Sequence, residues 1–265
     1  SSAASDVYKR QMLVDYEYTV VSGQLVLLPK DLPPQIKLDI LNSQLYAQLY
    51  ASLTSNKFSD PMAWDERLTK ARSELKWATR FSLSRRPELA DGAILDATSL
   101  LMEQFAHAPH FDRPVMEEPI RLGLKALAHP SPAQELFFDS VLRVTQAGSS
   151  LKIGPVSDVL LHVCVVSPKA HLIDVQLGFS LRGALDHLLF EHPYPGKDVS
   201  GPMSLSVSET ELDTLAYSWI RDKVKDGLGA EGVKRIMSLD LPTAVITPDP
   251  LSGCCNSTLK DARDE

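Results

Sequence analysis

Apolar and polar residues alternate near the start of the chain. In residues 12–21 the apolar side chains at every second position share one face, and the polar side chains between them share the other. This period of two predicts a strand with one buried face. Ser22 and Gly23 can turn the chain, so residues 24–28 are expected to return as a second strand. The pattern therefore predicts an N-terminal β-hairpin.

The period changes to that of a helix at Pro34. Leucine, isoleucine and tyrosine recur every three or four residues over 36–53, which predicts an amphipathic helix that begins near this proline. Asp60 followed by Pro61 is a typical helix start, and the apolar spacing over 64–78 predicts a second helix. Weaker helical patterns follow over three further ranges, 94–106, 118–127 and 133–144.

β-Branched residues become frequent from about residue 150. Residues 160–166 and 171–180 alternate and are separated by a turn over 167–170, which predicts an antiparallel hairpin. Further short strands are expected over 79–83, 151–156, 185–191 and 203–207.

A closing helix is expected after these strands. Ser208 and Glu211 form the S-x-x-E pattern of a capping box, in which each side chain bonds a free backbone amide at a helix start. Apolar residues at helical spacing follow, and Gly227 and Gly229 are expected to end the helix. These two glycines and Gly232 also match a dinucleotide-binding fingerprint, but no strand precedes them, so no nucleotide cofactor is expected.

The order of these elements predicts the α+β class, with an N-terminal β-hairpin plus helices, then an antiparallel β-sheet with a closing C-terminal helix. Strands and helices do not alternate regularly, so a doubly wound parallel sheet is not expected. We divide the chain into a mainly helical region with the hairpin over 12–147 and an antiparallel β region with closing helices over 148–242. The polar segment 243–265 is expected to be a disordered tail.

Residues 1–11 have a separate origin. Their sequence, SSAASDVYKRQ, is identical at every position to the translation of a widely used transposase sequencing adapter. We therefore exclude them from the fold as an adapter artefact and expect the chain to derive from an assembled environmental sequence. Met12 is then either the true start or an internal methionine, and an upstream signal peptide stays an open alternative.

Composition is that of an ordinary globular protein, with 44% apolar and 23% charged residues. The net charge of −7, without a cluster of lysine and arginine, argues against nucleic acid as a partner. No apolar run reaches the roughly 20 residues that a transmembrane helix needs. Three cysteines are too few for a disulfide framework, so a cytoplasmic location is expected.

Part of the helical region resembles a segment of uncharacterised bacterial proteins. The resemblance is carried by residues 41–51, LNSQLYAQLYA, followed by Asp60, Pro61 and Trp64. In such proteins a helix of this kind precedes an aromatic helix and a β-rich half. The resemblance implies a bacterial origin, and it implies no activity and no functional residues.

Two histidines and a cysteine in the predicted hairpin are candidate metal ligands. His162 and Cys164 alternate on one strand and so share a face. If the turn spans 167–170, Val166 pairs with His171, which then joins that face. Zinc is bound by these residue types. Because apolar residues share the face and no fourth ligand is apparent, a sheet core is the simpler interpretation, and no metal cofactor is expected.

A catalytic site would use His187, Glu191 and His192, which can supply a general acid and base. No nucleophile elbow or zinc-protease motif accompanies them, so surface loop residues are the competing interpretation. Tyr46 and Tyr50 lie one turn apart beside the leucines of the long helix. Because tyrosine is enriched at interfaces, these two are the candidate contact with a protein partner.

Three functional hypotheses follow. The leading one is a non-enzymatic binding or assembly protein, with a protein partner or as a homo-oligomer, because aromatic helices are present without a convergent set of polar residues. The first alternative is a hydrolase that uses the loop histidines, since many active sites have no linear signature. The second is a membrane-active toxin component that inserts the hairpin over 158–180. Residues 158–166 are apolar on both sides, which favours burial in a core over insertion.

Overall fold

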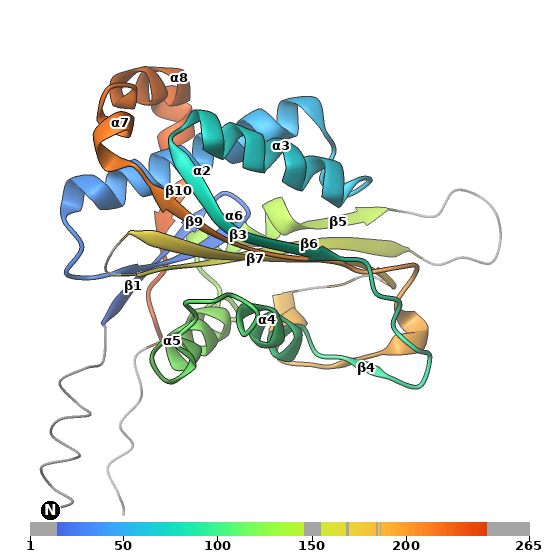
Figure 1. The fold of residues 1–265 in the computed structure, drawn as a ribbon. Coiled ribbons are helices and arrows are strands. Elements are labelled where there is room, and N and C mark those ends of the chain that lie inside the picture. The colour runs from blue at the N-terminus through green and yellow to red at the C-terminus, as the bar shows by residue number, and fades with distance from the viewer. Residues whose placement is uncertain (1–14, 146–154, 168–169, 184, 186, 243–265) are drawn as a thin grey trace, which may run out of the picture.

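The computed structural model describes residues 15–145, 155–167, 170–183, 185 and 187–242. In this part of the chain an eight-stranded sheet lies between two layers of helices (Figure 1). The fold is α+β, with seven α-helices among these residues, a mostly antiparallel sheet and the expected N-terminal hairpin. The adapter-like segment and the expected C-terminal tail lie outside the described residues.

The elements alternate irregularly along the chain. Those of the first half are β1 (Tyr16–Val21), β2 (Gln24–Pro29), α2 (Pro34–Thr54), α3 (Pro61–Glu74), β3 (Trp77–Arg85), β4 (Ile94–Leu95), α4 (Ala97–Phe105), α5 (Arg113–Ala126) and α6 (Pro132–Val141). Those of the second half are β5 (Leu142–Thr145), β6 (Val156–Val166), β7 (His171–Arg182), the 3₁₀ helices η1 (His187–Phe190) and η2 (Gly196–Asp198), β8 (Tyr194–Pro195), β9 (Ser204–Leu212), α7 (Thr214–Ser218), α8 (Arg221–Val233) and β10 (Ile236–Ser238).

The large sheet has the strand order β10-β1-β2-β6-β7-β9-β3, and β5 pairs with one end of β6. All neighbouring strands run antiparallel except β2 and β6, which run parallel. The expected turn at Ser22 and Gly23 joins β1 to β2, and Ser22 takes the positive φ of 53° that such a tight turn requires. The two regions expected from the sequence thus contribute strands to one sheet.

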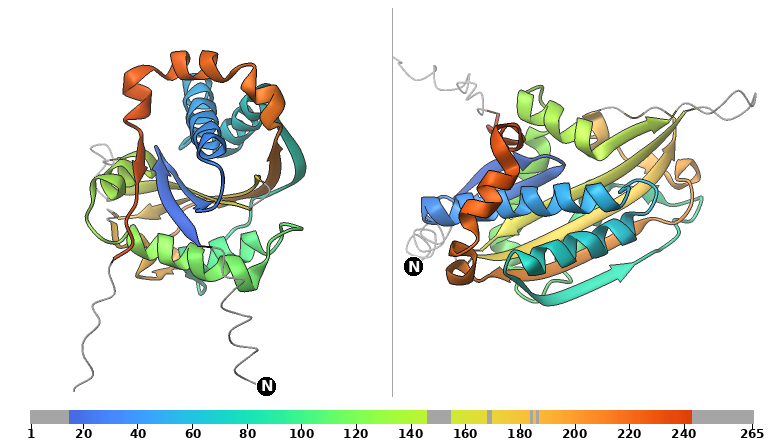
Figure 2. Two further views of the ribbon diagram at one scale, coloured as in Figure 1. Left: turned by 90° about the vertical axis from the view of Figure 1, so that its left-hand side faces the viewer. Right: turned by 90° about the horizontal axis from the view of Figure 1, so that it is seen from above.

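Each face of the sheet is covered by its own set of helices (Figure 2). Helices α4, α5 and α6 pack on one face, where Phe105, Ile120 and Phe137 are fully buried. Helices α2 and α3 pack on the other face, where Trp64 is buried, and α7 and α8 lie over α2, where Tyr217 is buried (Figure 2). Full burial of one such side chain contributes about 1.5–3 kcal/mol, so the apolar layers account for much of the stability.

The start of α3 confirms the local signal in the sequence. The side chain of Asp60 accepts a hydrogen bond from the backbone amide of Ala63, and Pro61 occupies the first turn. No helix among the described residues is both long enough and apolar enough to cross a membrane.

The closing helix does not begin where the sequence predicts. Ser208 and Glu211 lie in β9, and Asp213 is the residue that caps α7 through the amide of Ala216. The capping-box expectation is wrong because β9 is paired on both sides, with β7 and β3, and these two ladders outweigh a local helix start. The strand expected over 185–191 is also wrong, because η1 occupies most of it.

Candidate functional site

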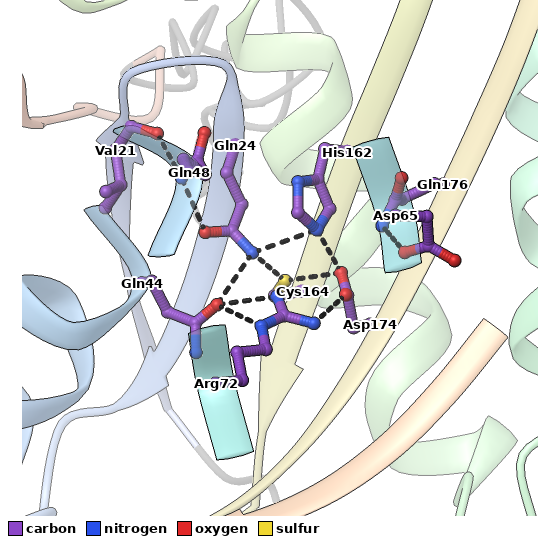
Figure 3. A network of polar contacts seen from close by, with 10 residues as sticks. All are labelled: Val21, Gln24, Gln44, Gln48, Asp65, Arg72, His162, Cys164, Asp174 and Gln176. Atoms are coloured by element: carbon purple, nitrogen blue, oxygen red, sulfur yellow. Dashed lines mark hydrogen bonds and ion pairs between the residues drawn. The ribbon is translucent and has the colours of Figure 1, made fainter. Parts of the chain in front are cut away.

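A cluster of buried polar side chains lies between the sheet and helices α2 and α3 (Figure 3). We call it the polar cluster, and its members are Gln24 of β2, Gln44 of α2, Arg72 of α3, His162 and Cys164 of β6, and Asp174 of β7. Each is at most 2% exposed. Buried polar groups are costly without partners, so a cluster drawn from five elements is the most distinctive chemistry of the fold.

The pairing of β6 with β7 brings three of these residues together. Cys164 lies directly opposite Asp174, and His162 comes two residues earlier in β6, opposite Gln176. Side chains two apart on a strand, and directly opposite on its neighbour, point to the same face. One atom from each of His162, Cys164 and Asp174 lies within 4.8 Å of the others.

Arg72 links helix α3 to this group. Its guanidinium donates to one oxygen of Asp174 and, through Nε at 3.0 Å and Nη2 at 2.6 Å, to the side-chain oxygen of Gln44. The two side chains of the ion pair are 3% and 2% exposed. A buried pair of this kind adds little net stability, but removing one partner leaves an uncompensated charge.

Electrostatics keep the carboxylate charged and the thiol neutral. Burial alone would raise the pKa of Asp174, but the charge of Arg72 and the contact with His162 outweigh burial and hold that pKa well below its usual range. Burial, and then the charge of Asp174, raise the pKa of the Cys164 thiol well above its usual value. The cysteine is therefore an inert thiol in this environment unless a cation displaces its proton.

The structure brings together only part of the predicted metal-ligand set. His162 and Cys164 share a face as expected, but Val166 pairs with Leu172, so the predicted pairing with His171 is wrong by one residue. A shift of one residue moves every side chain of a strand to the other face. Asp174, and not His171, is therefore the third candidate ligand on the face of His162 and Cys164.

His171 instead faces two acidic residues of β9. Its ring nitrogens lie 4.0 Å from Glu209 and 3.7 Å from Glu211. His110, in the segment after α4, contacts the same Glu209 at 2.6 Å, although it is otherwise exposed. The sequence does not predict this second group, because its pattern predicts a helix at Glu209 where the structure has a strand.

The predicted catalytic residues lie at the start of η1 and just after it. His187 begins η1, and Glu191 and His192 follow it as exposed residues. Their catalytic role stays a prediction.

The tyrosines of the predicted interface have an intramolecular neighbour. Tyr46 and Tyr50 are half-buried and line a cavity of about 190 Å³ together with Ile220 and Val224. A Cβ placed on Gly227 of α8 would lie 2.9 Å from the Tyr46 ring, so α8 packs closely over it. The interface role of the two tyrosines stays a prediction.

A second cavity, of about 200 Å³, opens beside the start of α3. It is lined by Asp65, Gln176, Ser204 and Ser206, among others, and Gln176 donates to Asp65 at 2.5 Å. Burial, and then the nearby charge of Asp174, raise the pKa of Asp65. The polar cluster therefore continues into a polar surface that runs across the sheet beneath α3.

No protein-family model and no curated protein matches the chain. Among solved structures the chain is similar to a delta-endotoxin, with 8% identity and a TM-score of 0.39, over 72% of this chain and 81% of that one. A second such structure is the activated Cyt2Ba monomer from Bacillus thuringiensis subsp. israelensis, with the same identity, TM-score and share of this chain, and 98% of its own length.

These findings correct two expectations. The similarity to these solved structures runs against the resemblance to an uncharacterised bacterial family and against the leading hypothesis of a binding or assembly protein, and neither is kept. Similarity at this distance carries no argument about what this chain does.

Proposed function

We propose that this protein is membrane-active and that it inserts the strands β6, β7 and β9 into a lipid bilayer. The observation that carries the proposal is the two-sided character of these three neighbouring strands. One face is apolar almost throughout, with Val159, Leu161, Val163, Val165, Ile173, Val175, Leu177, Phe179, Leu205 and Val207.

The opposite face is polar over most of β7 and β9. Asp174 lies beside Ser208, and Gln176 lies beside Ser206, so polar residues form rows across the strands. β6 by itself is apolar on both sides over most of its length, which favours a core. The polar side chains are contributed by its neighbours, which a reading of one strand does not include.

The lengths of the strands suit a bilayer. β6 has 11 residues, β7 has 12 and β9 has 9, and a tilted strand needs about 9–11 residues to cross the hydrocarbon layer. In the folded protein the apolar face is covered by α4, α5 and α6. Lipid tails are as apolar as a leucine-rich core, so exchanging these helices for lipid costs little hydrophobic free energy.

The helices over the polar face are held by polar contacts in addition to the apolar packing of residues such as Trp64 and Leu68. Arg72 of α3 and Gln44 of α2 connect to the sheet through hydrogen bonds and an ion pair. Water can replace such contacts more readily than it can replace apolar packing. Separation of both helix layers would leave strands with one face suited to lipid and one suited to water.

The test is leakage of dye-loaded phosphatidylcholine vesicles with a reversible lock on α6. The hydroxyls of Ser22, in the β1–β2 turn, and Ser140, on α6, are 3.2 Å apart, so cysteines at both positions can form a disulfide. Cys254 and Cys255 are replaced by serine in every sample. We expect leakage from the reduced double variant and from each single variant, and none from the oxidised double variant.

Two results would contradict the proposal. One is the absence of leakage with the unmodified chain at micromolar concentration, in phosphatidylcholine vesicles both with and without phosphatidylethanolamine. The other is equal leakage from the oxidised and reduced forms of the locked variant, because α6 would then stay attached to the sheet during the activity.

A further inference from the structure

Three side chains with unshared electron pairs meet at the centre of the polar cluster. They are Nε2 of His162, Sγ of Cys164 and Oδ1 of Asp174. All three side chains are buried, and they project from the middle of two paired strands. Strand pairing therefore holds a nitrogen, a sulfur and an oxygen in fixed positions around one point.

The orientation of Gln24 identifies two of these atoms as hydrogen-bond acceptors. Nε2 of Gln48 donates to the backbone carbonyl of Val21 at 3.0 Å, which fixes the nitrogen end of that amide. The same nitrogen donates to Oε1 of Gln24 at 3.2 Å. Gln24 must therefore turn its NH₂ group toward His162 and Cys164, and its nitrogen lies 3.2 Å from Nε2 of His162.

A further acceptor faces the same two atoms. Oδ1 of Asp174 contacts Nε2 of His162 and lies 3.0 Å from Sγ of Cys164. Three such atoms in mutual contact must hold either a proton, as when the Cys164 thiol donates to Asp174, or a metal cation between them. Arg72 does not place its charge at this point, because its guanidinium bonds the other carboxylate oxygen of Asp174 and the side chain of Gln44.

We propose that His162, Cys164 and Asp174 bind a zinc-like divalent metal ion. Zinc is bound by imidazole nitrogen, thiolate sulfur and carboxylate oxygen, and three protein ligands with a water molecule complete its usual coordination of four. Thiolate and imidazole favour zinc over magnesium and calcium, which prefer oxygen ligands. This inference is independent of membrane activity, since it concerns the folded chain alone.

Two neighbouring side chains suit the role of supports for the ligands. Arg72 holds the free oxygen of Asp174, and Gln24 donates toward the sulfur of Cys164. Such contacts around a metal site orient the ligands, and losing one typically lowers metal affinity by about 10–100-fold. The site is closed by α2 and α3, so a bound ion would clamp β6 to β7 rather than meet a substrate.

The experiment measures metal binding by the full chain with Cys254 and Cys255 replaced by serine, which leaves Cys164 as the only thiol. The protein is loaded with Zn²⁺ or Co²⁺ both in the native state and during refolding from urea, so that burial does not prevent entry. We expect one ion per chain, a cobalt–thiolate charge-transfer band, release of the thiol proton and a higher melting temperature.

Variants separate the site from general effects. Cys164→Ser is expected to abolish the charge-transfer band, and His162→Gln to lower affinity by at least about tenfold. Ser208→Ala, beside Asp174 on β9, should bind metal normally. The proposal is overturned if the refolded parent binds no stoichiometric ion, or if Cys164→Ser binds zinc as the parent does. In either case protons occupy the cluster instead.

Discussion

The ion pair between Arg72 and Asp174 gives the sharpest stability prediction. Asp174→Asn keeps the size of the side chain but removes its charge, so the buried guanidinium keeps hydrogen bonds only to amide oxygens, with Asp65 as a nearby carboxylate. Leaving one charge of a buried pair without its partner costs about 3–5 kcal/mol. Because a domain is stable by only about 5–15 kcal/mol, the loss is a large part of the total.

The loss is measured by urea unfolding in the presence of a chelator, followed through the buried tryptophans Trp64 and Trp77. We expect Arg72→Met to be destabilising as well, and the double variant to lose less than the sum of the singles by about 1–3 kcal/mol. A loss below about 1 kcal/mol for Asp174→Asn, or strict additivity, would refute the reasoning.

The same pair sets the response to acid. The pKa of Asp174 is lower in the folded protein than in the unfolded chain, where it is about 3.9. Its contribution to stability is therefore complete above the unfolded value and is lost as the pH falls toward the folded one. The parent should lose more stability below about pH 4 than Asp174→Asn does.

Three further predictions concern other parts of the fold. Burial, and then the nearby Tyr18, raise the pKa of Tyr16 to about 12. The melting temperature should therefore fall as the pH rises from about 10 to 12, and Tyr16→Phe should make that fall smaller. Gly196→Ala would push a Cβ onto a backbone carbonyl and should cost about 1–3 kcal/mol in urea unfolding, whereas Gly92→Ala meets nothing within 4 Å and serves as its control. Iodide should quench only Trp219, which is 74% exposed, and Trp219→Phe should abolish quenching; residual quenching would show that a buried tryptophan is accessible.

Local signals were enough to predict the elements that depend on local chemistry. The hairpin turn at Ser22 and Gly23 and the start of α3 at Asp60 were correct, because turn and cap residues act on their own backbone. The same kind of signal failed at Ser208. A capping-box pattern also fits a strand when neighbouring strands pair with both of its sides.

The site required information that no single segment contains. The turn before β7 is closed by a hydrogen bond from the amide of Ser167 to the carbonyl of His171, with Ala170 at a positive φ of 59°, and this sets the register that selects Asp174. Gln24 reaches Cys164 only because β2 pairs in parallel with β6 across 140 positions of sequence. An acidic residue in the middle of a strand rich in apolar side chains was the one signal that pointed to Asp174.

The unpaired side of β3 affects how folded molecules behave at high concentration. β3 is nine residues long and is the last strand on its side of the described sheet, so its outer backbone groups form a template for aggregation. Arg80 and Arg85 place positive charge along it, and Arg80 is anchored to Glu211 at 2.7 Å. Repulsion between these charges opposes stacking of two molecules side by side, so the colloidal stability of the folded chain depends on two arginines that belong to neither proposed site.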